Sequence, residues 1–101
     1  MAESDVQRAI LDYLTLKHVF HYRNNSGMMV SEYKGRKRFT RFGAVGSPDI
    51  VCVVKGQYVG IEVKALKGRQ TENQKEFQRQ LEAAGGRYIL AFSLDDITSA
   101  L

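Results

Sequence analysis

The N-terminal part of the chain carries a hydrophobic stripe with the spacing of a helix. Its members are Val6, Ala9, Ile10, Tyr13 and Leu14. Residues three and four apart lie on one face of a helix, so the stripe predicts a helix over 5–17 that packs against a core. Ser4 opens the sequence Ser-Asp-Val-Gln, which is typical of a capping box at a helix N-terminus.

Two short runs of apolar, mostly β-branched residues follow near the middle of the chain, at 49–54 and 58–63. The segment between them contains Lys55-Gly56-Gln57, and together they predict a β-hairpin. If the connection spans 54–57, Asp49 faces Glu62 across the two strands. A slip of one residue in this register would separate the two carboxylates.

A second hairpin is predicted earlier in the chain. The runs 28–34 and 38–42 flank Gly35-Arg36-Lys37, which suits a turn between two strands. The turn sequence at 24–27 separates this hairpin from the first helix, and the glycine-containing segment 43–46 is a flexible approach to the strand at 49–54.

The C-terminal part of the chain predicts a helix, a strand and a short helix. The helix runs over 72–84, is capped by Thr71 and is stopped by the glycines at 85–86. Its apolar stripe consists of Phe77, Leu81 and Ala84. A strand at 87–92 follows, and the sequence Ser93-x-x-Asp96 starts a short C-terminal helix that runs through Ile97 to Leu101.

These elements run in the order α-β-β-β-β-α-β-α and predict an α/β domain with a mixed β-sheet flanked by helices. The strand at 87–92 follows a crossover helix, so we expect it to be parallel to 58–63. The strands 49–54 and 58–63 are apolar on both faces, which predicts central positions. A chain of 101 residues with 44% hydrophobic content suits one domain with one modest core.

Charge adds a candidate partner. Fifteen Lys and Arg against eleven Asp and Glu give a formal net charge of +4, which favours contact with a polyanion. We call the densest basic segment the basic arm; it consists of Lys34, Arg36, Lys37, Arg38 and Arg41. Lys67 and Arg69 form a second cluster beside the strand at 58–63. We expect both clusters to contact phosphates; the alternative is an ordinary, mildly basic surface.

Other classes of site are disfavoured. Cys52 is the only cysteine and lies in an apolar strand, so it predicts a buried core residue in a reducing compartment. His18 and His21 follow the first helix without the spacing of a Cys or His metal site, and we expect cap or surface roles. The sequence shows no signal peptide and no apolar run of membrane-spanning length, so we expect a cytoplasmic protein that does not enter a membrane.

The predicted register brings candidate chemistry together. Lys64 follows Glu62 on the same face, opposite Asp49, because strand side chains repeat every second residue. Hard divalent cations prefer oxygen ligands, polarise a phosphodiester and activate water. The Val63 carbonyl can add a third oxygen, and the Lys64 ammonium can hold the attacking water or neutralise charge on the phosphate. The pattern therefore predicts a Mg²⁺ or Mn²⁺ nuclease site with Asp49, Glu62 and Val63 as ligands.

Two strings carry a resemblance to a known family. They are Gly46-Ser47-Pro48-Asp49 and Ile61-Glu62-Val63-Lys64-Ala65, followed by Gln74 and Phe77. They resemble the PD-(D/E)xK nuclease superfamily, with its restriction-endonuclease-like core, and within it the stand-alone phage and bacterial form of the virus-type replication-repair nuclease (VRR-NUC) branch. The resemblance spans nearly the whole chain. It implies metal binding by Asp49 and Glu62 and catalysis by Lys64, with an orienting role for Gln74 and a supporting acidic role for Glu3.

Two of these residues have a second interpretation. Glu3 can instead complement the N-terminus of the first helix. Gln74 ends the capping-box sequence Thr71-Glu72-Asn73-Gln74, so its side chain can serve the backbone, the site, or both.

The resemblance implies a structure-specific DNA endonuclease similar to Holliday-junction resolvases, which act on four-way junctions. Flaps, plain duplex or a restriction-like role are alternatives for the substrate. A different class, a DNA-binding or assembly module with a vestigial nuclease site, is the alternative for the function. A four-way junction has two-fold symmetry and needs two matched cuts, whereas the chain offers one site, so we expect a homodimer.

Overall fold

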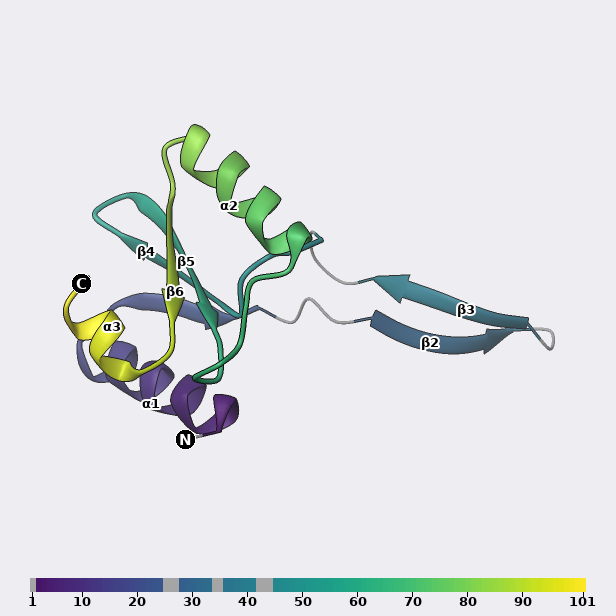
Figure 1. Cartoon of the computed structure of the whole chain (residues 1–101), viewed down its shortest axis with the longest axis horizontal. Helices are drawn as coiled ribbons and strands as arrows, with labels where there is room; N and C mark the ends of the chain where they lie inside the picture. The colour runs from purple at the N-terminus through teal and green to yellow at the C-terminus, as the bar shows by residue number, and fades with distance from the viewer. Residues whose placement is uncertain (1, 25–27, 34–35, 42–44) are drawn as a thin grey trace.

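The computed structural model describes residues 2–24, 28–33, 36–41 and 45–101, with the backbone alone for those between 28 and 41. Within these residues the protein is a small α/β domain with three helices, a four-stranded mixed sheet and a two-stranded sheet (Figure 1). The elements are α1 (Glu3–Leu16), β1 (Phe20–Arg23), β2 (Met28–Tyr33), β3 (Arg36–Arg41), β4 (Ile50–Val54), β5 (Gln57–Val63), α2 (Glu72–Ala83), β6 (Arg87–Ala91) and α3 (Leu94–Thr98).

The four-stranded sheet has the order β1-β4-β5-β6. β4 pairs with β1 and β5 in antiparallel fashion, and β6 pairs with β5 in parallel after the crossover through α2. The expected parallel strand and the central positions of the two apolar strands are both confirmed.

The turn between β4 and β5 sets the register on which the candidate site depends. Lys55 and Gly56 have φ values of 51° and 78°, as in the two-residue type I′ turns that match the twist of a hairpin. Val53 consequently pairs with Tyr58, and Ile50 pairs with Ile61. The predicted register is confirmed. The connection is shorter than the four residues predicted, because Val54 and Gln57 pair with each other as the ends of β4 and β5.

The hydrophobic core lies on the face of the sheet that α1 and α3 cover (Figure 1). The buried cluster consists of Val6, Ile10, Leu14, Ile50, Cys52, Val59, Ile61, Val63, Ile89, Ala91 and Ile97. Cys52 is fully buried, as expected. α2 lies on the opposite face; its Phe77 and Leu81 are half-buried, its Ala84 cap is exposed, and no residue of the helix is fully buried.

The N-terminal prediction was wrong in two respects. α1 begins at Glu3, with Ala2 as the N-cap and no side-chain capping bond, so Ser4 lies inside the helix. The chain then leaves the helix through His18, whose φ is 58°, and forms strand β1, which the sequence pattern did not predict. His21 therefore lies in a strand, paired with Cys52, and its ring contacts the Val19 carbonyl at 2.7 Å.

The second hairpin is confirmed as the antiparallel pair β2 and β3, which extends away from the four-stranded sheet (Figure 1). β3 begins two residues earlier than predicted, so Arg36 and Lys37 are paired strand residues. The side chains of the basic arm lie outside the described residues, as do segments 25–27, 34–35 and 42–44.

The helix α2 and the strand β6 follow the predicted bounds to within one residue, whereas α3 ends at Thr98 and does not extend to Leu101 as predicted. Asp96 accepts hydrogen bonds from the backbone N–H groups of Phe92 and Ser93, at 2.8 and 3.2 Å, and so fixes the start of α3. Among the helices that the structure describes, none has the length and apolar character needed to cross a membrane.

Candidate active site

Three residues of the predicted site meet at the end of β5. Asp49 precedes β4 and continues its register, so it lies opposite Glu62. The Asp49 Oδ2 atom accepts a hydrogen bond of 2.8 Å from the Val63 backbone N–H. The Lys64 N–H donates to the Ala91 carbonyl at 2.9 Å, which extends the pairing of β5 with β6 and fixes the Lys64 backbone. In an extended strand the N–H and C=O of one residue point to the same side, so the Val63 carbonyl lies on the Asp49 side of β5.

The segment before Asp49 runs between the sheet and the first turn of α2. Gly46 has a φ of 78°, and a Cβ atom there would collide with the Asn73 carbonyl, so only glycine allows this approach. Ser47 and Pro48 are buried. Pro48 lies over Gly60 of β5, where a Cβ atom would come within 2.6 Å of the proline Cγ. Two glycines therefore allow the close packing that holds Asp49 at the end of β4.

Gln74 serves both the backbone and the site. Its Oε1 accepts from the Thr71 N–H at 2.9 Å, and its own N–H donates to the Thr71 hydroxyl at 3.2 Å, which completes the capping box. Its Nε2 donates to the Glu62 Oε1 at 2.9 Å. The helix cap fixes the orientation of the amide, and the amide in turn orients Glu62.

Glu62 is the strongly perturbed carboxyl group of the site. It is 3% exposed. Burial raises its pKa to about 9, with the hydrogen bond to Asp49 and the Asp49 charge acting in the same direction and the Lys64 ammonium opposing them. We therefore expect the metal-free carboxyl pair to hold one proton between its two members at neutral pH. The charge of Glu3, in the first turn of α1, also raises this pKa, so Glu3 is near the site and both of its interpretations stay open.

The donor set fits a hard divalent cation, which could replace the shared proton on the carboxyl pair. Across the described ranges, no group of three or more His, Cys, Asp or Glu side chains is arranged to hold a metal. Asp49 and Glu62 would therefore need the Val63 carbonyl, water or phosphate oxygens to complete the coordination.

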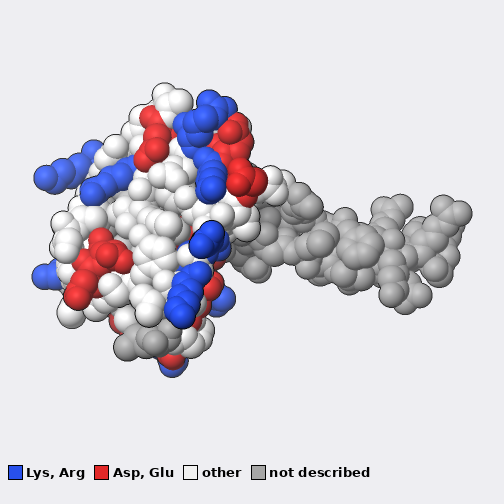
Figure 2. Space-filling model, in the orientation of Figure 1, with Lys and Arg blue, Asp and Glu red and all other residues white. Residues whose placement is uncertain are grey.

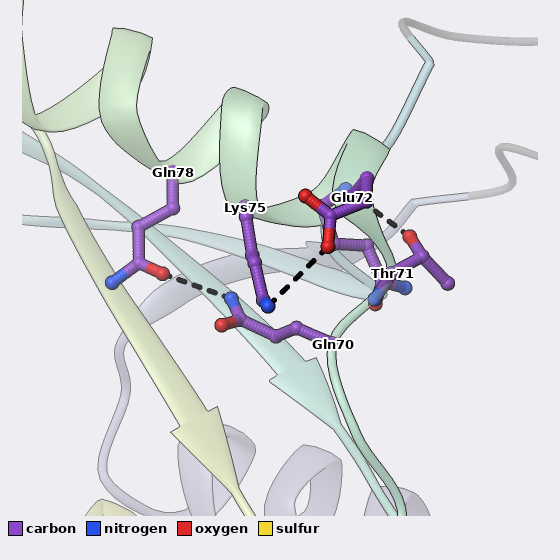
Figure 3. A network of polar contacts seen from close by, with 6 residues as sticks. Gln70, Thr71, Glu72, Lys75 and Gln78 are labelled. Atoms are coloured by element: carbon purple, nitrogen blue, oxygen red, sulfur yellow. Dashed lines mark hydrogen bonds and ion pairs between the residues drawn. The ribbon is translucent and has the colours of Figure 1, made fainter.

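A polar network surrounds the start of α2 (Figure 3). Gln70 donates to Gln78 at 2.8 Å, and Lys75 lies 3.4 Å from Glu72.

Tyr88 lies on the α2 face of the sheet, because it pairs with Gly60. Its hydroxyl is buried and has no hydrogen-bond partner within the part of the chain that the structure describes. Burial raises the pKa of Tyr88 to about 12, so the group remains a hydrogen-bond donor.

The second basic cluster is exposed, as expected. Lys67 and Arg69 lie in the segment between β5 and α2. Figure 2 shows Lys and Arg side chains that follow one another from this segment onto α2, with Asp and Glu side chains beside them on the helix. In the chain this segment follows directly after Lys64, whereas the side chains of the basic arm lie outside the described residues.

Sequence reasoning missed the contacts of Asn24 and Tyr88. Asn24 was read only as part of a turn, yet its side chain bonds to Ser47 and Pro48. Alternation along β6 places Tyr88 and Leu90 on one face, but the parallel register that brings Tyr88 beside β5 has no local signal.

No protein-family model matches this chain, and no curated protein matches it significantly. The interpretation of the site therefore depends on its own geometry and on the sequence motifs.

Proposed function

We propose that this protein is a metal-dependent DNA endonuclease with a PD-(D/E)xK core. The observation that carries the proposal is the carboxyl pair of Asp49 and Glu62 beside Lys64, in which Glu62 is buried and Asp49 is half-buried. Burying an acidic group beside a second one destabilises a fold unless a partner compensates the charge. A DNA-binding module needs no acidic pair facing phosphates, so the arrangement favours catalysis over a vestigial site.

The residues have separate tasks in phosphodiester hydrolysis. Asp49, Glu62 and the Val63 carbonyl would hold Mg²⁺ or Mn²⁺, which when bound supplies positive charge for the phosphate and lowers the pKa of water. Lys64 positions the attacking water or neutralises charge on the phosphate. The water oxygen attacks phosphorus, the bond to the leaving oxygen breaks, and that oxygen takes up a proton. The Val63 N–H and the Gln74 amide orient Asp49 and Glu62, respectively.

Within this proposal the preferred substrate is branched DNA, with the four-way junction first, and the working unit is a homodimer. The sequence resemblance supports the substrate, and the symmetry of a junction supports the dimer. Lys67, Arg69 and the basic arm would contact the phosphates. Flaps and plain duplex are the competing substrates.

The test is cleavage of labelled junction, flap and duplex DNA with Mg²⁺ or Mn²⁺. Asp49→Ala, Glu62→Ala and Lys64→Ala should each abolish cleavage, because residues that act as one catalytic unit do not replace one another. Glu82→Ala, at an exposed carboxylate of α2, is the matched control and should cleave like wild type. Wild-type turnover in any of the three site variants would refute the assignment, and DNA binding without cleavage by wild type would favour the vestigial module.

Light scattering at micromolar concentration tests the dimer. A strict monomer that still makes paired, symmetric nicks in a junction would contradict the symmetry argument. A monomer that makes single nicks would point to a flap or nicking enzyme.

A further inference from the structure

Asn24 is bonded to three consecutive residues that end at Asp49. Its Nδ2 donates to the Ser47 hydroxyl and to the Pro48 carbonyl, both at 3.0 Å. Its backbone N–H donates to the Asp49 carbonyl at 2.7 Å, which extends the pairing of β1 with β4 beyond its last paired residues. Asn24 thus fixes the path of the chain immediately before the carboxyl pair.

The surroundings of these bonds make them consequential. Ser47 is 8% exposed, so its hydroxyl has little access to water as an alternative partner. On its other side the segment that contains Ser47 is held by close packing, with Gly46 against Asn73 and Pro48 against Gly60. The Asn24 side chain supplies the directional contacts, which set the rotation of the segment as well as its position.

We propose that Asn24 is a positioning residue for Asp49 and that its side-chain amide sets the metal affinity of the site. Asn24 directly precedes the segment that carries β2 and β3, and its partners Ser47 and Pro48 follow that segment. It therefore joins the two ends of the hairpin next to the carboxyl pair. This inference rests on the proposed function only for its metal-binding part; the positioning of Asp49 is a property of the metal-free chain.

Two variants separate positioning from general stability. Asn24→Ala removes both side-chain bonds, and Asn24→Asp keeps the size of the side chain but replaces its N–H donors by acceptors. Gln57→Ala is the matched control, because the Gln57 Nε2 also donates to a backbone carbonyl, that of Gly85, at 3.0 Å. That bond lies at the opposite end of β5 from Val63.

The first measurement is hydrogen exchange of the Val63 amide in the metal-free, full-length protein, since this N–H reports directly on the Asp49 carboxylate. In both Asn24 variants we expect the Val63 amide hydrogen to exchange at least about tenfold faster than in wild type. The exchange rates of the other β5 amides, and of the Val63 amide in Gln57→Ala, should not change. Unchanged exchange at Val63 in whichever variant folds would overturn the proposal, as would a uniform increase along β5.

The second measurement is Mn²⁺ binding by calorimetry. The Asn24 variants should bind roughly tenfold more weakly or worse, the usual effect of removing an outer-shell contact, and Gln57→Ala should match wild type. Wild-type affinity in the Asn24 variants would overturn the metal-binding part. If wild type itself binds no Mn²⁺, the proposed nuclease function fails, while Val63 exchange still decides whether Asn24 positions Asp49.

Discussion

Replacement of Glu62 by Gln tests whether the metal-free carboxyl pair holds a proton at neutral pH. Gln has the shape of a protonated Glu, so it can keep the hydrogen bond from Gln74 and donate to Asp49. In wild type the pKa of Glu62 is raised to about 9 by burial and by the neighbouring Asp49. The variant should therefore resemble metal-free wild type at low pH and diverge from it as the pH rises.

The sign and size of the divergence follow from proton linkage. An unfolded chain has a Glu pKa of about 4.3, so between that pH and about 9 the folded protein binds more protons than the unfolded chain. The free energy of unfolding of wild type should thus fall as pH rises through this window, by up to about 1.4 kcal/mol per pH unit. Since 1 kcal/mol corresponds to about 4–8 °C in a domain of this size, Tm should fall by several degrees per unit.

The assay is thermal unfolding with chelator present, from pH 5 to pH 8.5, for wild type, Glu62→Gln and the exposed-site control Glu82→Gln. We expect the control to follow wild type and Glu62→Gln to lose less Tm with rising pH. Adding Mg²⁺ at a concentration of one hundred times its Kd should raise the free energy of unfolding of wild type by about 2.7 kcal/mol, and its Tm with it. Glu62→Gln should show no such rise. Parallel pH curves for wild type and Glu62→Gln would show that Glu62 is already ionised, and the argument would fail.

Four further predictions follow from the same contacts. Thr71→Ala and Gln74→Ala should each lower the free energy of unfolding by about 1 kcal/mol, because each removes the helix cap. Only Gln74→Ala should also lower kcat, and equal kcat values in the two variants would limit Gln74 to capping. Gly46→Ala should cost about 1–3 kcal/mol for its backbone conformation alone, measured by urea unfolding, and wild-type stability would contradict the close approach to α2. Metal binding at pH 7 should release a proton from Glu62, seen by calorimetry in buffers of different ionisation enthalpy; buffer-independent heat would contradict this. Neutralising the basic arm should flatten the salt dependence of DNA binding by about 0.9 per lost phosphate contact, with the rate at saturating DNA changed much less; an unchanged slope would move the phosphate track to Lys67 and Arg69.

The part of the site that the sequence predicts is the part set by local rules. A two-residue turn and strict alternation fix the pairing of β4 with β5, and so the meeting of Asp49 with Glu62 was predictable. The Gln74 capping box is equally local, with its partner three residues away. Its second bond, to Glu62, joins residues on different elements, so the capping sequence alone does not predict it.

The missed features depend on contacts between distant parts of the chain. β1 has only four residues, follows a helix without Gly or Pro, and leaves Phe20 and Tyr22 exposed, so its pattern lacks the signals of a buried strand. The bonds from Asn24 to Ser47 and Pro48 join residues that are separated in sequence by the whole β2–β3 hairpin. The Ser4 capping pattern failed because it is a preference, and α1 continues past it to Glu3.

The two faces of the sheet differ in how freely their sequences can change. The face under α1 and α3 carries the hydrophobic cluster, where most substitutions would leave a cavity or a clash. The face under α2 carries the carboxyl pair, and no residue of that helix is fully buried. Outside its capping residues and the half-buried Phe77, Gln78 and Leu81, the exposed positions of α2 can therefore vary at little cost in folding free energy. If the protein acts on DNA as proposed, that latitude makes α2 the natural element for redesigning which substrate is accepted, with the opposite layer left untouched as scaffold.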